Sequence, residues 1–196
     1  RYNYEERGQY AVLLKPRTDS RDGERKIQSR MGLSASAEYV DEFLKEISTI
    51  WKKENTEYRY QGKKVDAVLV DEAQFLSEAE IDTLSDLVDF YNIPVICYGL
   101  RTDFRNRLFP GSRRLMEIAD VIEEVPTVCW CGKRAQCNTR YANGEIVREG
   151  AQIMLGSNES YVALCRKHYK EGKLWKEAGA ENETSTRRNC KIMEKE

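Results

Sequence analysis

Short apolar runs alternate with amphipathic stretches along the first two thirds of the chain. Four runs have the length and composition of buried strands: residues 10–14, 65–70, 94–100 and 121–125. Three other stretches repeat apolar side chains at helical spacing: residues 36–50, 77–91 and 112–119. This alternation predicts an α/β fold with a mainly parallel sheet, helices on both faces, and ligand sites at the carboxyl ends of the strands.

Two of the predicted helices have recognisable ends. Ser36 is available to cap the first helix, and Ser77 with Glu80 has the spacing of a capping box at the start of the second, which we expect to end near Asn92. Residues 17–30, between the first strand and the first helix, are rich in charged and small side chains, so we expect a solvated loop there.

The pattern changes after residue 126. Residues 127–171 consist of short, turn-rich segments with cysteines, and Asn143-Gly144 is a hairpin signal. Residues 172–196 contain few apolar side chains, which predicts a disordered polar tail. We therefore expect an α/β core at residues 1–126, a small hairpin domain at residues 127–171, and the tail.

The charge balance narrows the classes of partner. The 196 residues include 32 Lys and Arg against 33 Asp and Glu, so no net positive field attracts nucleic acid or an acidic membrane. No apolar run approaches the ~20 residues that span a bilayer, and the first residues do not resemble an export signal. We expect a cytosolic, cytoplasmic protein with neither a nucleic-acid nor a membrane partner.

The apolar run at residues 65–70 ends abruptly in two adjacent carboxylates, Asp71 and Glu72. Carboxylates at the end of a buried strand suit phosphoryl transfer. In that interpretation Asp71 holds Mg²⁺ and Glu72 accepts the proton of an attacking hydroxyl. Acidic residues are also common where helices and loops begin. The pair by itself does not decide between these two interpretations.

Six cysteines in a chain without an export signal favour a metal site or free thiols over disulfides. Two groups, Cys129 with Cys131 and Cys165 with His168, offer three sulfur ligands and one nitrogen ligand. That ligand set suits a closed tetrahedral Zn²⁺ site with a structural role. The alternative is a set of buried thiols beside a surface histidine. Cys137 is a substitute ligand or, as we expect, a packing or pocket residue.

Aromatic residues surround a predicted strand end, in the segments 98–104 and 109–111. They could stack on a flat ligand or simply pack beneath the loop. The sequence contains no G-x-x-x-x-G-K-[ST] phosphate-binding loop, since Lys64, Arg134 and Leu174 follow its three Gly-Lys pairs.

Four features in this order resemble the type II thymidine kinases, especially their bacterial branch, from about Tyr2 to Tyr169. They are Val70-Asp71-Glu72-Ala73-Gln74-Phe75, the segment from Tyr98 to Gly111, Gly156-Ser157-Asn158-Glu159-Ser160-Tyr161, and the two Cys/His groups. The Cys-x-Cys and Cys-x-x-His spacings match the bacterial pattern rather than the four-cysteine animal form. The resemblance implies a P-loop-type kinase core, a parallel sheet flanked by helices, followed by a small zinc-binding hairpin or lasso domain.

The resemblance also implies roles for individual residues. Glu72 resembles the general base. The implied binding site for ATP and its Mg²⁺ consists of Asp71, Glu72, Ala73 and Gln74. The implied thymidine-binding residues are Phe75, Leu100, Arg101, Phe104, Phe109, Gln152, Met154, Leu155, Gly156 and Tyr161. The implied ligands of the structural zinc, which fixes both ends of the lasso, are Cys129, Cys131, Cys165 and His168. Asp19 and Arg21 fall where the family has an acid and an arginine near the phosphates.

The implied activity is ATP-dependent phosphorylation of thymidine, and of deoxyuridine, to the 5′-monophosphate in nucleotide salvage for DNA synthesis. The family further implies a homotetramer with feedback inhibition by thymidine triphosphate. The alternatives are a zinc-ribbon binding module without catalysis and a fragment of a DEAQ-box nucleic-acid ATPase. The family's phosphate-binding loop would lie upstream of Arg1. Either the sequence begins within a longer protein or the product is truncated, and in the second case we expect negligible kinase activity.

Overall fold

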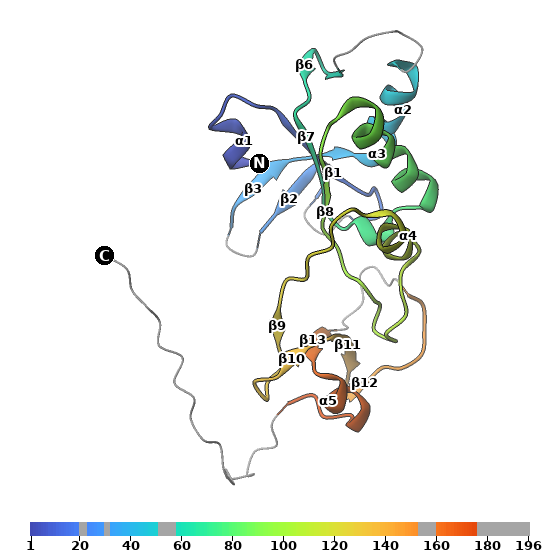
Figure 1. Ribbon diagram of the computed structural model, residues 1–196. Coiled ribbons are helices and arrows are strands. Elements are labelled where there is room, and N and C mark those ends of the chain that lie inside the picture. Colours follow the sequence, from blue (N-terminus) through green and yellow to red (C-terminus); the bar gives the residue numbers. More distant parts are fainter. Residues whose placement is uncertain (20–22, 30–31, 51–57, 153–159, 176–196) are drawn as a thin grey trace, which may run out of the picture. The chain divides into compact units, whose positions relative to one another are not determined.

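The computed structural model describes residues 1–19, 23–29, 32–50, 58–152 and 160–175, apart from the side chains of residues 47–50 (Figure 1). The chain forms two compact units. They comprise Arg1–Val125 with Arg148–Ser157, and Pro126–Val147 with Asn158–Glu196. The chain therefore leaves the first unit after residue 125 and returns to it before the second unit is complete. Among the described residues, no helix is both long enough and apolar enough to cross a membrane.

A four-stranded parallel sheet forms the centre of the first unit. Its strands lie in the order β4-β1-β7-β8, with the bounds Glu38–Tyr39, Ala11–Lys15, Ala67–Val70 and Val95–Cys97. Leu14 of β1 pairs with Val70 of β7, and Val70 pairs with Cys97 of β8. Strand β7 is buried along its whole length, which explains its continuous apolar sequence. The prediction of an α/β fold with a parallel sheet is confirmed.

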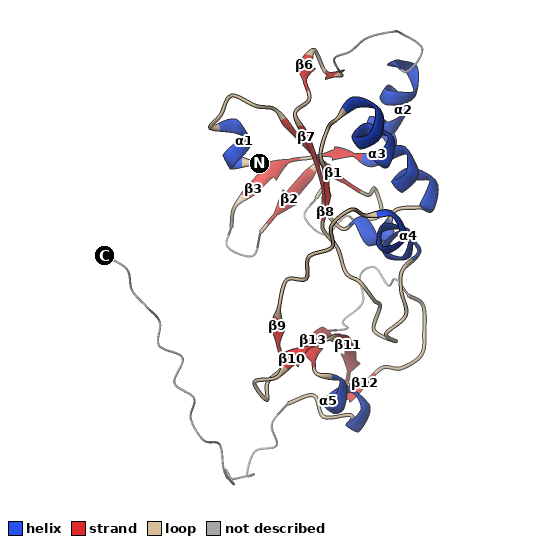
Figure 2. Cartoon of the chain, in the orientation of Figure 1, coloured by secondary structure: helices blue, strands red, loops and turns tan. Residues whose placement is uncertain are grey.

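Helices pack on both faces of this sheet (Figure 2). One face is covered by α2 (Val40–Ile50), α3 (Glu78–Tyr91) and α4 (Pro110–Ile118). Phe43 and Leu84 of these helices are fully buried against the strands, and each such side chain contributes about 1.5–3 kcal/mol of hydrophobic stabilisation. On the other face Tyr4 of the short α1 (Tyr2–Glu5) packs against Leu69 and its neighbours.

Helix α3 has the ends that its sequence predicts. The Ser77 side chain accepts a hydrogen bond from the backbone N–H of Glu80, and the Glu80 carboxylate accepts one from the backbone N–H of Ser77, so the capping box is complete. Asn92 ends the helix in the left-handed conformation, which asparagine adopts more readily than most residues.

Three local predictions are wrong. Ser36 does not cap α2, because it lies in β3 (Ser34–Ser36), which pairs with β2 (Lys26–Gln28). This hairpin also occupies part of the segment predicted to be a solvated loop. Residues 121–125 form no strand in the described structure, where no ladder pairs with them, and Val121 and Val125 are exposed. An apolar run becomes a strand only where a neighbour satisfies its backbone groups.

The second unit is built from short antiparallel strands. They are β9 (Thr127–Val128), β10 (Arg134–Ala135), β11 (Cys137–Ala142), β12 (Glu145–Ile146) and β13 (Ser160–Leu164), followed by helix α5 (Arg166–Glu171). The predicted hairpin is confirmed, since Asn143 and Gly144 link β11 to β12 with φ of +52° and +82°. Leu174 is buried in the small core, and Trp175 packs edge-on against Tyr141. Residues 172–175 of the predicted tail are therefore ordered, and residues 176–196 lie outside the described residues.

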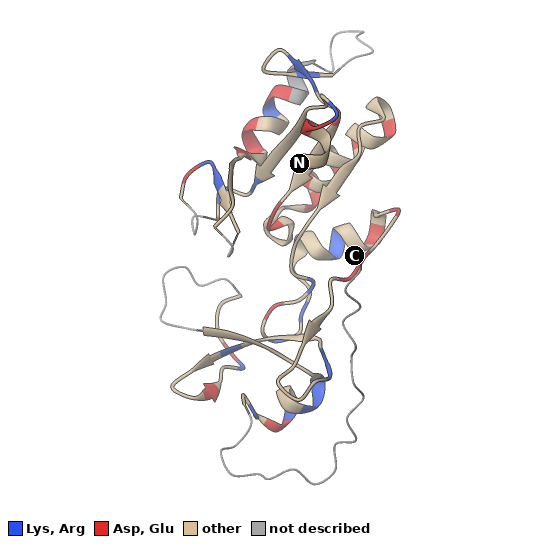
Figure 3. Cartoon of the chain, turned by 90° about the vertical axis from the view of Figure 1, so that its left-hand side faces the viewer, with Lys and Arg blue, Asp and Glu red and all other residues tan. Residues whose placement is uncertain are grey.

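Two further elements belong to the first unit. A hairpin pairs β5 (Arg59–Tyr60) with β6 (Lys63–Lys64), and a 3₁₀ turn, η1 (Ala73–Phe75), follows β7. Figure 3 shows acidic and basic residues interspersed along the described chain, in keeping with the nearly balanced charge of the sequence.

Candidate active site and metal centre

The two adjacent carboxylates lie at the carboxyl end of β7, where a parallel sheet places its ligands. The backbone N–H of Asp71 donates to Leu14 O of β1 at 2.9 Å, and Asp71 Oδ1 accepts from the backbone N–H of Glu72 at 3.0 Å. Glu72 has a φ of +52°, a left-handed conformation that costs a glutamate on the order of 1 kcal/mol. This conformation changes the direction of the backbone directly after β7, so the residues that carry the two carboxylates do not extend the strand.

Gln74 joins the acidic pair to the next strand end. Its side chain is 1% exposed; its Nε2 donates to Glu72 Oε2 at 2.5 Å, and its Oε1 accepts from the backbone N–H of Leu100 at 3.0 Å. A Cβ at Gly99 would lie 2.5 Å from Gln74 Oε1, so a larger residue at this position would displace the Gln74 amide. One buried carboxamide therefore fixes both the Glu72 carboxylate and the loop that begins at Leu100.

Helix α4 packs closely on the turn that carries Gln74. A Cβ at Gly111 would come within 2.6 Å of Ala73 O and 2.7 Å of Leu76 O, so the helix and the turn touch through their backbones. Phe75 and Phe109 meet edge to face with ring centroids 5.7 Å apart. These contacts bring together two aromatic residues from the predicted thymidine site.

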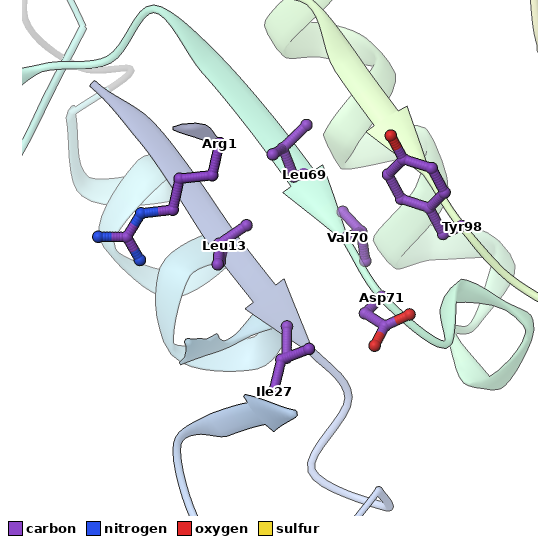
Figure 4. Close-up of a pocket in the computed structure, with 7 residues that line it drawn as sticks. All are labelled: Arg1, Leu13, Ile27, Leu69, Val70, Asp71 and Tyr98. Atoms are coloured by element: carbon purple, nitrogen blue, oxygen red, sulfur yellow. The ribbon is translucent and has the colours of Figure 1, made fainter. Parts of the chain in front are cut away.

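A cavity of about 310 Å³ lies beside Asp71, on the face of the sheet opposite α2 and α3 (Figure 4). Leu13 of β1 and Leu69 of β7, which are paired in register, form part of its apolar wall, and Tyr98 and Ile27 add to it. The Asp71 carboxylate is the acidic group among the lining residues. Arg1 also lines the cavity, so its mainly apolar wall carries one basic and one acidic residue.

The loop after β8 folds around a buried acid. Asp103 is 1% exposed; Oδ1 accepts from the backbone N–H groups of Arg105 and Arg107, and Oδ2 accepts from the Arg105 guanidinium and the Gln152 amide. Burial opposes the ionisation of Asp103, but the donors on Arg107 and Arg105 outweigh it and lower the pKa of this carboxyl. Phe104 beside it is buried, whereas Leu100 and Arg101 are exposed.

Four side chains of the second unit form a group that could hold a metal ion: Cys129, Cys131, Cys165 and His168. Their ligand atoms all lie within 4.8 Å of one another. The distance from Cys129 Sγ to His168 Nδ1 is 3.4 Å, and the two other sulfurs lie 3.9 Å apart. A tetrahedron with ordinary zinc bond lengths has edges of about 3.6 Å for S to N and about 3.8 Å for S to S, so the ligand set fits such an ion.

The surroundings favour metal binding further. Burial opposes the ionisation of the Cys129 thiol, but the backbone N–H groups of Cys131 and Cys165 and the neighbouring imidazole lower its pKa to about 6. The Trp130 ring stacks on His168 with the ring centroids 4.1 Å apart, which fixes the orientation of the imidazole. Cys137 is buried in the adjacent core and is not a member of the four-residue group.

The other predicted site residues are placed as follows. Tyr161 lies on β13 of the second unit, where its hydroxyl accepts from Arg140 Nε at 2.9 Å. Asp19 is buried beside Lys15, with 3.5 Å between the charged atoms. Outside the described residues lie Arg21, Met154, Leu155 and Gly156.

Two buried charged groups of the first unit were not predicted. Lys15, at the end of β1, is fully buried and donates to Lys26 O at 3.0 Å as well as pairing with Asp19. The sequence did contain a signal for the role of Asp103, because an aspartate in a loop often accepts a hydrogen bond from the backbone N–H two residues later. Lys15 had none, since a lysine that ends an apolar run is normally solvated.

The sequence is also similar to known proteins. The model of the thymidine kinase family matches residues 1–169. A thymidine kinase of Haemophilus influenzae is 46% identical over 171 residues, covering 87% of this chain and 86% of that protein. Thymidine kinases of Legionella pneumophila and Pasteurella multocida are 44% and 43% identical, covering 89% and 87% of this chain and 82% and 86% of their own lengths. The chain belongs to the thymidine kinase family.

Proposed function

We propose that the protein transfers the γ-phosphate of ATP to the 5′-hydroxyl of thymidine, and of deoxyuridine, in nucleotide salvage. The observation that carries the proposal is Glu72, a carboxylate turned out of the end of a buried parallel strand and held by the buried Gln74 amide. Such a group is positioned by the fold rather than by the substrate, as a general base should be. The alternatives of a nucleic-acid ATPase fragment and a zinc ribbon do not account for the family match.

In this proposal Glu72 accepts the proton of the 5′-hydroxyl as that oxygen attacks the phosphorus. Gln74 keeps one carboxylate oxygen of Glu72 engaged at 2.5 Å and so limits the rotation of the base. Asp71 is the carboxylate that would hold the Mg²⁺ of ATP, which when bound offsets the charge of the phosphates. Ala73, whose backbone N–H donates to Tyr98 O at 2.9 Å, keeps the turn close to the neighbouring strand end.

The thymidine-binding residues that we propose in the first unit are Phe75, Leu100, Arg101, Phe104, Phe109 and Gln152. Phe75 is partly exposed and meets Phe109 edge to face, which supports a role in contacting a flat base, whereas Phe104 is 1% exposed and would support this group from beneath. On the family resemblance alone we add Tyr161, Met154, Leu155 and Gly156 to the proposed residues.

We propose that the metal is Zn²⁺ and that its role is structural. Four protein ligands fill a tetrahedral shell and leave no position for a reacting water. The ligands come from the β9–β10 turn and from the start of α5, so the ion would join elements that only a small core otherwise holds together.

Substitution of the proposed base tests the activity. In the full-length gene product, Glu72→Gln should keep the urea unfolding midpoint and lower kcat for thymidine by about 10²–10⁴-fold, because the amide accepts no proton. Glu78→Gln, at an exposed glutamate in the first turn of α3, is the matched control and should retain full turnover. Equal kcat values for the two variants would refute Glu72 as the base. No turnover of thymidine by the wild-type protein would refute the proposed function.

From the family we also propose a homotetramer that thymidine triphosphate inhibits and that works in the cytoplasm. Mass photometry of the full-length protein tests the assembly. Inhibition of turnover by thymidine triphosphate, with cytidine triphosphate as control, tests the regulation.

A further inference from the structure

The buried carboxylate of Asp103 joins two segments that are distant in sequence. It lies in the loop after β8, and its Oδ2 accepts from Gln152 Nε2 at 3.1 Å, 49 residues further along the chain. Arg105, which donates to the same oxygen through Nε and Nη2, also donates from Nη1 to Gly150 O at 3.3 Å. Two separate hydrogen bonds therefore connect residues 150–152 to this loop.

The loop itself is fixed at several points. Asp103 Oδ1 accepts from two backbone N–H groups, and Thr102 pairs with Leu108 across the base of the loop. At the start of the loop, the Leu100 N–H donates to Gln74, and Leu100 O accepts from Ser112 Oγ at 2.7 Å. The rigid part of the loop is therefore joined, through Gln74, to the turn that carries Glu72.

Only some of the hydrogen bonds that the Asp103 carboxylate accepts come from its own loop. Its backbone bonds and part of its pairing with Arg105 are local and would stabilise any such turn. The bond from Gln152 and the Arg105–Gly150 bond are not local, and they depend on a charged acceptor and on the planar Arg105 guanidinium. A neutral residue at position 103 would leave the partly exposed donors of Arg105 and Gln152 without their shared charged acceptor.

We propose that Asp103 is a positioning residue for nucleoside binding, which holds residues 150–152 against the loop of Leu100 and Phe104 through Arg105 and Gln152. The proposal rests on the thymidine kinase activity proposed above. Asp103 does not touch the substrate; it sets the spacing between two segments that do. Its loss therefore weakens thymidine binding without changing the phosphoryl-transfer step or the binding of ATP.

The experiment tests the hydrogen bond between Asp103 and Gln152 by exchanging its acceptor and its donor between the two positions. Asp103→Asn turns an acceptor into a donor that opposes Gln152, whereas the double variant Asp103→Asn with Gln152→Glu restores one donor and one acceptor across the same gap. In the full-length protein we expect the single variant to raise the KM for thymidine about tenfold, the effect of losing a hydrogen bond to a charged group. The kcat and the KM for ATP should stay within about twofold.

The double variant should recover most of the lost thymidine affinity. A purely structural role would lower the urea midpoint and leave the KM for thymidine unchanged, and a double variant that folds but recovers no thymidine affinity would show that the bond between positions 103 and 152 does not set this affinity. Either result overturns the proposal. If Asp103→Asn does not fold, Gln152→Met removes the distant donor and leaves the pairing with Arg105, and an unchanged KM for thymidine then refutes it. Absence of turnover in the wild-type protein would instead refute the proposed activity.

Discussion

Replacing Gln74 by leucine tests how the fold positions the proposed base. Leucine has a similar volume and keeps the site buried, but it removes the donor to Glu72 Oε2 and the acceptor for the Leu100 N–H. The Leu100 N–H then lacks its partner, which costs about 1–3 kcal/mol, and the gain from the more apolar side chain offsets part of this. We expect the free energy of unfolding to fall by about 2 kcal/mol.

The effect on turnover should be larger than the loss of stability suggests. Without Gln74 the Glu72 carboxylate can rotate, and a misplacement of about 1 Å in a catalytic group costs about 10²-fold in rate. We expect kcat for thymidine to fall about 10–100-fold. Gly99→Ala, whose Cβ would lie 2.5 Å from Gln74 Oε1, displaces the same amide without removing it and should lower kcat by a smaller factor.

The assay measures kcat beside urea unfolding for each variant. The matched control is Leu84→Ala, which leaves a cavity in the core against which α3 packs. This cavity should lower the free energy of unfolding by about 2–5 kcal/mol, at least as much as Gln74→Leu does. Leu84 is not bonded to Glu72, so this variant should keep its kcat while it remains folded. If Gln74→Leu and Leu84→Ala have the same kcat, Gln74 does not position the base and the argument fails.

Three further predictions concern other contacts. Gly111→Ala should lower the urea midpoint and raise the KM for thymidine, because its Cβ would lie 2.6 Å from a backbone oxygen of the turn that carries Gln74; an unchanged midpoint would contradict the close packing. Metal analysis should find about one zinc per chain in the wild type and a loss of zinc and thermal stability in Cys165→Ser, and full zinc content in that variant would exclude the four-ligand site. In metal-free protein, the ultraviolet absorbance of thiolate should rise with a midpoint near pH 6, the pKa of Cys129, while Cys97, whose pKa burial raises to about 11, should contribute no thiolate at neutral pH; absence of the step near pH 6 would contradict the environment of Cys129.

Local patterns predicted the features that depend on neighbours in the sequence. Residues 67–70 are all apolar because β7 is buried on both faces, and this can be read from the sequence without knowledge of the neighbouring strands. The capping box at Ser77 and the hairpin at Asn143-Gly144 use residues within a few positions of each other. The ligand pairs were also local, since Cys-x-Cys and Cys-x-x-His each place two ligands on one turn.

The wrong predictions arose where pairing decided the structure. Ser36 has the composition of a helix cap, yet it pairs with Lys26 in a hairpin that the sequence does not indicate. Residues 121–125 have the composition of a strand, yet the described structure pairs them with no neighbour. Both outcomes depend on whether a partner is available for the backbone groups, and strand propensity contains no information about that.

The sequence by itself determined the α/β class, the two carboxylates at a strand end and the two halves of the metal-binding group, because each follows from periodicity or spacing over a few residues. Only the tertiary structure decided how these parts are held. It joined Gln74 to Leu100 across 26 residues, Cys129 to His168 across 39 and Gln152 to Asp103 across 49. Such contacts depend on strand order, register and the path of the loops, which the packing of the whole chain sets, so no local pattern could specify them.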